Sequence, residues 1–176
     1  MRNACHLVAI CSCALLAALP SRAYAVWPEV AAAARLAAQE TVLRTSLAAT
    51  AAVIVRAPLA LELHFPARLA FAADRAELLP GGIAMLDALA RSLREYKRTQ
   101  VVVAVYTDLI GGSDYNQQQA QARAGVVVAY LQIRGIAPER LIARGGGEAA
   151  QLAAPNTPEG RDLNRRLELT ITPLSS

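Results

Sequence analysis

The sequence predicts an α+β domain, a two-layer sandwich in which a mixed β-sheet has helices on one face. Apolar residues at helical spacing in residues 81–97 precede VVVAVY, an apolar run of strand length at residues 101–106. A second helical stripe and two more strand-like runs follow. The order strand, helix, strand, helix, strand, loop, strand is typical of a sheet packed against helices.

The N-terminal segment, residues 1–25, has the layout of a secretory signal peptide. A basic start precedes an apolar run at residues 7–19, and small residues at Ala23 and Ala25 favour cleavage after Ala25. A lipoprotein signal that uses Cys13 is the alternative, although the residues before Cys13 make a poor lipobox. We expect a mature protein that is soluble or peripheral in the periplasm.

Residues 26–57 are predicted to form an alanine-rich helical lead-in to a domain of residues 58–174. The predicted helix, residues 28–50, has one apolar stripe, formed by Leu36, Leu43 and Leu47. The stripe suits packing on the domain or a role as a spacer. From the stripe alone, we expect this helix to be the element that binds an envelope protein partner.

The remaining elements are bounded by turn and capping signals. Two strands flank Ala57-Pro58, at residues 51–56 and 59–65, and are typical of a hairpin. Further strands are predicted at 101–106, 139–145 and 165–172, a helix from Ser113 or Asp114 to near Gly135, and a loop at 145–160. The continuous apolar run at 101–106 is typical of a strand covered on both faces.

Composition excludes several classes of function. Without residues 1–25, 16 Lys and Arg stand against 14 Asp and Glu, a balance that gives no electrostatic case for nucleic-acid binding. All three cysteines and one of the two histidines lie within that segment. The one histidine that remains, His64, is too few for a histidine-ligated zinc site. We therefore expect no metal and no cofactor. We also expect no transmembrane span in the mature chain.

The stretch TDLIGGSDYNQQQAQARA, residues 107–124, places charged and polar groups between a strand and a helix. Asp108 follows the buried strand directly, and Asn116 and Arg123 are seven residues apart, so they share a helix face. If that face turns towards the loop, the three groups converge and fit a zwitterionic ligand, with its ammonium on the carboxylate and its carboxylate on the arginine. The alternative is an internal ion pair between Asp108 and Arg123.

The order of the motifs is more specific than any one of them. TD-x-x-G, YN, RA, G-x-G-E and GR-x-x-NRR follow one another and, together with LAFAADRAELLPGG, closely resemble the OmpA-like C-terminal domain over residues 60–172. The resemblance implies a βαβαββ order, a periplasmic location at the cell wall or outer membrane, and no enzymatic activity. It also implies noncovalent binding of the peptidoglycan stem peptide through its diaminopimelate residue, which tethers the protein or an envelope complex to the wall.

The resemblance also assigns residues by their position in these motifs. Asp108 would take the side-chain ammonium of diaminopimelate and Arg123 its carboxylate. Asn116 would lie beside the pocket, Thr107 would help to order the loop, and Asp74 would form part of the pocket wall.

The sequence departs from the family pattern at two places. Val105-Tyr106 stand before TD, where members commonly have Gly-His, and Gln119-Ala120 replace the usual Leu-Ser. These changes leave the ligand groups in place and bear on affinity for the wall rather than on family membership.

A cationic cluster precedes the last strand and comprises Arg161, Asn164, Arg165 and Arg166. We interpret it as structural, satisfying loop carbonyls and pairing with acids such as Glu148, in preference to direct contact with the ligand.

The competing function is a cell-wall hydrolase with a carboxylate pair, Asp108 with Glu148 or with Asp74. An arginine near Asp108 would keep that acid ionised rather than raise its pKa, which argues against the hydrolase. The absence of a predicted metal site argues against it as well.

Overall fold

The computed structural model describes residues 21–174, and side chains from residue 29 onwards. Residues 1–20, with most of the predicted signal peptide and Cys13, lie outside the described residues. The predicted cleavage point after Ala25 falls within the first helix, α1 (Ser21–Leu47). No helix in the described part is both long and apolar enough to cross a membrane.

One mixed sheet of five strands organises the fold, in the order β1-β2-β5-β3-β4. Its strands are β1 (Val53–Ala57), β2 (Ala60–Pro66), β3 (Thr99–Tyr106), β4 (Leu141–Gly147) and β5 (Arg166–Pro173). β3 pairs with β4 in parallel, and the other neighbours pair antiparallel. β3 therefore lies inside the sheet, between β5 and β4, and the loop that follows it starts from a fixed point.

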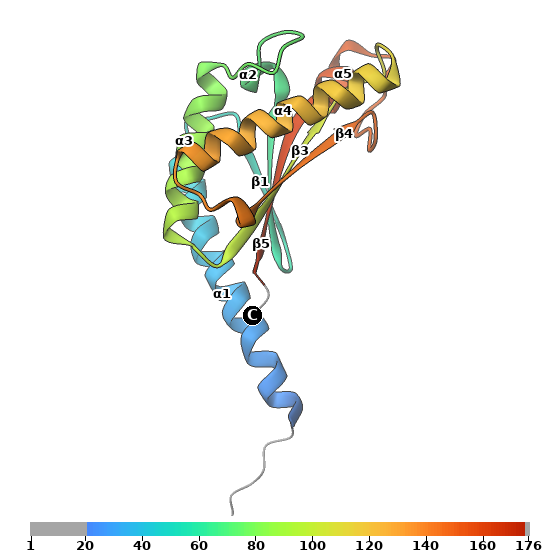
Figure 1. Ribbon diagram of the computed structural model, residues 1–176. Coiled ribbons are helices and arrows are strands. Elements are labelled where there is room, and N and C mark those ends of the chain that lie inside the picture. The colour runs from blue at the N-terminus through green and yellow to red at the C-terminus, as the bar shows by residue number, and fades with distance from the viewer. Residues whose placement is uncertain (1–20, 175–176) are drawn as a thin grey trace, which may run out of the picture.

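The long helices cover one face of this sheet (Figure 1). The helical elements after α1 are α2 (Ala67–Ala70), α3 (Pro80–Glu95), α4 (Ser113–Ile133), the 3₁₀ turn η1 (Pro138–Arg140) and α5 (Pro158–Asn164). α3 enters through Pro80, whose missing N–H costs nothing at the first turn of a helix. The predicted two-layer α+β architecture is confirmed.

Burial alternates along the strands because only one face of the sheet meets the helices. Leu61, Leu63 and Phe65 of β2 are buried, whereas Glu62 and His64 on the other face are partly exposed. The core side of the neighbouring strands consists of Val101, Val103, Val105, Leu167, Leu169 and Ile171. The prediction that the strand at 101–106 is covered on both faces is wrong, because Val102 on the open face is partly exposed.

The predicted lead-in helix packs into the same core. Leu36, Leu43 and Leu47 are buried with the residues of α3 and the sheet, and the buried Gln39 donates to Ser92 Oγ of α3 at 3.2 Å. The stripe behind the partner-binding hypothesis is therefore covered by the domain itself, and the hypothesis loses its basis. The predicted boundary at 57/58 falls between two paired strands, β1 and β2.

Two local elements differ from the sequence prediction. The segment at 139–145 starts as the turn η1, so that β4 begins at Leu141. The predicted loop at 145–160 runs into the short helix α5, where the Thr157 hydroxyl caps the first turn by accepting from Gly160 N–H at 3.0 Å. Gly160 has no room for a side chain, because an added Cβ would lie 1.9 Å from the Ala154 carbonyl oxygen.

Shortening a stripe residue of α1 tests its place in the core. Leu43→Ala should lower the free energy of unfolding by about 2 to 5 kcal/mol, because it leaves a cavity among buried side chains. Val30→Ala, at a position of the same helix that is 60% exposed, should change it by less than about 0.5 kcal/mol. Urea unfolding of the processed protein measures both; equal effects would contradict the packing of α1.

Candidate functional site

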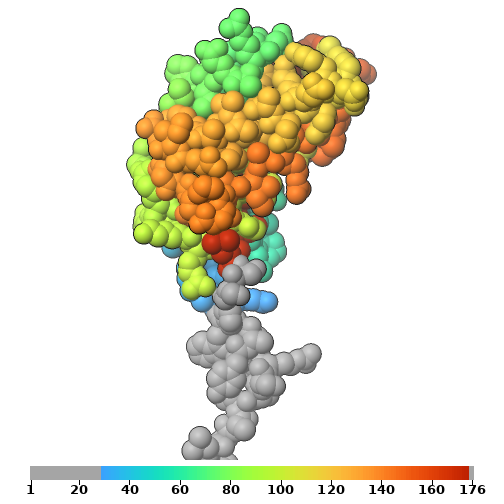
Figure 2. Space-filling model, in the orientation of Figure 1, coloured from blue at the N-terminus to red at the C-terminus, as the bar shows by residue number. Residues whose placement is uncertain are grey.

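A cavity of about 440 Å³ lies at the C-terminal end of β3, and we call it the β3 cavity. Its walls come from α2 and the segment after it, the loop after β3, one face of α4, and Arg165. In Figures 1 and 2 these elements gather at the end of the molecule opposite the C-terminus. Five predicted ligand residues line it: Asp74, Thr107, Asp108, Asn116 and Arg123.

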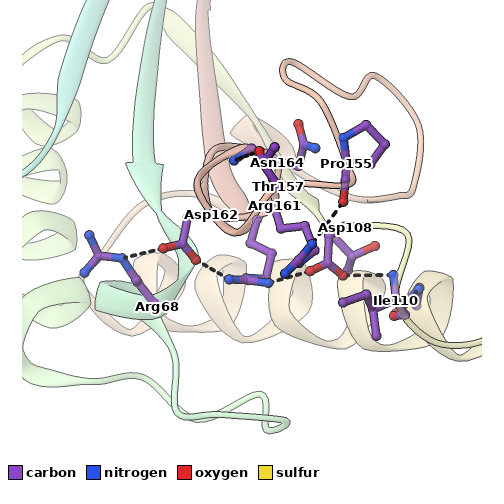
Figure 3. A network of polar contacts seen from close by, with 12 residues as sticks. Arg68, Asp108, Ile110, Pro155, Thr157, Arg161, Asp162 and Asn164 are labelled. Carbon is purple, nitrogen blue, oxygen red and sulfur yellow. Dashed lines mark hydrogen bonds and ion pairs between the residues drawn. The ribbon is translucent and has the colours of Figure 1, made fainter.

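Asp108 is the carboxylate of this cavity, and its side chain is almost fully buried. Its Oδ1 accepts from the backbone N–H of Ile110 at 3.1 Å, which closes the loop on itself. Its Oδ2 accepts from Nη1 of Arg165 at 2.5 Å, an ion pair between the end of β3 and the end of α5. Figure 3 shows Asp108 in a polar network that continues through Asp162 to Arg68.

Arg123 supplies a cation from α4, and it too is buried. Its Nε donates to the carbonyl oxygen of Arg75 at 2.9 Å, and its Nη2 donates to that of Ala72 at 3.2 Å. The guanidinium also stacks over the ring of Phe71, 5.2 Å from its centre. These contacts join α4 to the segment after α2 and use two of the five N–H donors of the guanidinium.

Asp74 lies in that segment with a left-handed backbone, φ 52°, which Asp adopts more readily than most residues. Its side chain is exposed and lines the cavity. Burial lowers the pKa of Arg123 from its ordinary value, and the charges of Asp74 and Tyr115 act in the opposite direction. Asp74 therefore supports the charged form of Arg123 without forming an ion pair with it in the described structure.

Asn116 and Thr107 fix the loop between β3 and α4. Nδ2 of Asn116 donates to the carbonyl of Ile110 at 3.1 Å and to Oε1 of Glu148 at 2.7 Å, so both amide hydrogens are used. The backbone N–H of Thr107 donates to the carbonyl of Gly147 at 2.8 Å. The Thr107 hydroxyl is buried and has no hydrogen-bond partner in the described part of the chain.

The charges of the cavity are not paired as the spacing alone suggested. Among the described residues, the ion pair of Asp108 is with Arg165, and no pair between Asp108 and Arg123 occurs. Arg165 also pairs with Asp162 and lines the cavity, which the structural interpretation of the cluster did not anticipate. The pairing of the cluster with Glu148 is wrong, because the recorded partner of Glu148 is Asn116.

The rest of the cationic cluster lies outside the cavity wall. The Asn164 side chain is buried and bonds the backbone of residues 152 and 153. Arg161 donates to the carbonyl of Pro155 at 3.3 Å. Arg166 donates to Glu168 at 2.7 Å and lies 4.0 Å from the centre of the Tyr106 ring.

The apolar wall of the cavity includes Phe71, Ile110 and Tyr115, none of which was among the predicted site residues. Each of these residues stands inside or beside a quoted motif, LAFAAD, TD-x-x-G or YN. Their position within the motifs was the available signal.

The Asn116 amide offers a test of how the loop is held. Asn116→Asp removes both donors and places a carboxylate beside Glu148, so it should lower the free energy of unfolding at pH 7 by about 1 to 3 kcal/mol. Repulsion raises the pKa of the new acid in the folded state, so the deficit is full above that pKa and shrinks as the pH falls through it. Gln118→Glu, exposed on the same helix, is the matched control for urea unfolding. A deficit that does not change with pH would contradict the repulsion.

Comparison with known proteins gives relatives in the bacterial cell envelope. The chain is 36% identical to probable lipoprotein YiaD of Escherichia coli K12, over 77% of this chain and 62% of YiaD. It is 36% identical to outer membrane protein A of Bordetella avium, over 65% and 59%, and 34% identical to peptidoglycan-binding protein ArfA of Mycobacterium tuberculosis, over 58% and 32%. The chain thus spans less than two thirds of each relative. The predicted periplasmic, wall-associated location agrees with these names.

Solved structures share the fold. A MotB-like protein from Desulfovibrio vulgaris superposes with a TM-score of 0.75 at 23% identity, over 83% of this chain and 99% of that one. The cell wall anchor of the T6SS from Pseudomonas aeruginosa gives 0.66 at 27% identity, over 74% and 96%. A profile of the OmpA family matches residues 70–165, which is more than half of the sequence, and the chain belongs to the OmpA family.

Proposed function

We propose that the chain binds peptidoglycan noncovalently, through the diaminopimelate residue of the stem peptide, and so tethers itself or an envelope complex to the cell wall. The observation that carries the proposal is the presence of Asp108 and Arg123 in the wall of one cavity. The name of ArfA, peptidoglycan-binding protein, and the wall anchor from Pseudomonas aeruginosa support the same class of ligand.

The free end of the diaminopimelate side chain carries an ammonium and a carboxylate on the same carbon atom. A ligand of this kind needs an acid and a base in the same small space, each able to form charge-assisted hydrogen bonds. Asp108 supplies the acid for the ammonium. Arg123 supplies the base, because its guanidinium retains N–H donors beyond the two that bond the carbonyls of Ala72 and Arg75.

Arg165 occupies the position that the ligand ammonium would take. Its Nη1 bonds the same Oδ2 that the ammonium would approach, and its Nη2 pairs with Asp162. The side chain of Arg165 is 39% exposed, so it can move towards Asp162 and keep an ionic partner. Because the ligand ammonium would take over the pairing of the buried Asp108 carboxylate, this exchange leaves no buried charge unpaired.

The other predicted residues position these two charges. Asn116 and Thr107 hold the loop that presents Asp108, and Asp74 supports the charge of Arg123 from the segment after α2. We assign the remaining cluster residues, Arg161, Asn164 and Arg166, to the structure of the neighbouring loops.

The proposal is for a binding protein and not for an enzyme. The hydrolase alternative requires a second carboxylate facing Asp108. Glu148 lies outside the cavity wall and accepts from Asn116. Asp74 does line the cavity, but Asp108 forms an ion pair with Arg165, and an ion-paired carboxylate does not suit the role of a proton-donating acid. No observation on the relatives favours a hydrolase.

Cosedimentation of the processed protein with purified sacculi that contain diaminopimelate tests the function. Asp108→Asn and Arg123→Lys should each weaken binding at least about tenfold, because the first removes the charge that meets the ammonium and the second removes the guanidinium fork. Glu139→Gln and Arg91→Ala, exposed and outside the cavity, are matched controls that should bind like the wild type. Urea unfolding of every variant separates lost binding from lost folding.

Competition then identifies the ligand group. Free meso-diaminopimelate should displace the protein from sacculi at concentrations at which lysine, which lacks the second carboxylate on the side chain, does not. Equal displacement by both compounds would overturn the assignment to diaminopimelate but leave wall binding intact. Equal binding by wild type and by folded Asp108→Asn protein would overturn the role of the cavity.

A further inference from the structure

Basic side chains gather at the end of the molecule opposite the β3 cavity. This basic end is formed by residues 91–98 and 134–140 with Arg35 and Asp87, and it holds seven of the eighteen Lys and Arg but three of the fourteen Asp and Glu. The whole-chain excess of four positive charges is thus concentrated there. In Figure 1 the orange end of α4 reaches α3 at the left side of the body.

Contacts between elements hold the basic end together. Arg94 of α3 donates to the carbonyl of Arg134 at the end of α4 at 3.0 Å. Arg134 pairs with Asp87 at 2.8 Å. Within the described part of the chain, by contrast, Arg35, Arg91 and Lys97 take part in no ion pair.

A recess of about 240 Å³ opens within this end, between α1, the turn after α3 and the end of β5. Apolar groups of Ala32, Tyr96 and Pro173 line it, and the exposed cations in its wall are Arg35, Lys97 and Arg98. Glu95 is the one carboxylate among its lining residues. The volume is below that of typical pockets for whole small molecules, about 300 to 1,000 Å³, and suits a small head group.

A buried cation, Arg140, bonds the backbone of residues that line the recess. The guanidinium of Arg140 donates to the carbonyls of Leu93, Tyr96 and Thr99 at 2.6 to 3.0 Å. These carbonyls belong to the last turn of α3 and the residues after it, where the negative end of a helix dipole would repel an anion. Arg140 satisfies them, and in the described structure it forms no ion pair with a carboxylate, so its positive charge offsets the negative end of α3 near the recess.

We propose that the basic end binds the surface of a membrane that contains anionic phospholipid, with a phosphate-bearing head group in the recess. Arg35 and Lys97 meet the phosphate, and the positive charge around them adds attraction over the length of the membrane contact. Charge complementarity selects this occupant, because apolar groups line the recess together with Arg35 and Lys97, which form no ion pair in the described part of the chain. The proposal does not rest on the peptidoglycan site, which lies at the other end of the sheet.

Flotation with lipid vesicles tests the proposal, with processed protein whose N-terminus is checked by mass spectrometry. The wild type should bind equimolar phosphatidylglycerol and phosphatidylethanolamine vesicles at least about tenfold more strongly than phosphatidylcholine vesicles. Arg35→Glu and Lys97→Glu should each weaken binding to the anionic vesicles by about tenfold, and the double variant further. Arg144→Glu, exposed on β4 outside the basic end, changes the net charge equally and should bind like the wild type.

Each other outcome counts against the proposal. Equal binding to neutral and anionic vesicles, no binding to either, or equal losses for Arg144→Glu and Lys97→Glu would overturn it. Displacement by soluble glycerol phosphate at submillimolar concentration would assign the recess to a free phosphate ester instead of a membrane. The double variant should still cosediment with sacculi, so failure here is distinguishable from failure of the wall-binding proposal.

Discussion

The carboxylate of Asp108 must keep a cationic partner, and much of the site follows from that requirement. Asp108 is only 6% exposed, and an unpaired charge so far from water would cost several kcal/mol. This partner is Arg165, which follows α5 directly and lies at the end of β3. In the proposed complex, a ligand ammonium would replace this partner without leaving Asp108 unpaired, and Arg165 would keep its ion pair with Asp162.

The loop between β3 and α4 is held by polar contacts rather than by apolar packing. Ile110 is exposed, so it contributes little burial to the loop. Order comes from hydrogen bonds made by the Asn116 amide, the Asp108 carboxylate and the backbone of Thr107. A loop held in this way can present charged groups to a ligand while its own backbone stays satisfied.

The features that could be predicted from the sequence each lie within a single periodic segment. The stripe of α3 and the seven-residue spacing of Asn116 and Arg123 are local, so helical geometry alone predicts them. The partner of Asp108 could not be predicted, because Arg165 is 57 residues away and reaches the cavity only through the pairing of β5 with β3. The fate of the α1 stripe was equally out of reach, since an apolar stripe is the same whether it meets its own domain or another protein.

The two proposed surfaces are related by the sheet itself. Thr99, the first residue of β3, lines the basic recess, and Thr107, directly after its last residue, lines the β3 cavity. Eight extended residues span about 26 Å. β3 is paired along its length with β5 on one side and β4 on the other, so the separation between the surfaces cannot change without breaking the sheet. A chain bound at both ends would hold a wall peptide and a lipid head group at a fixed spacing, and a pull on either ligand would be carried by the hydrogen bonds of the central strands.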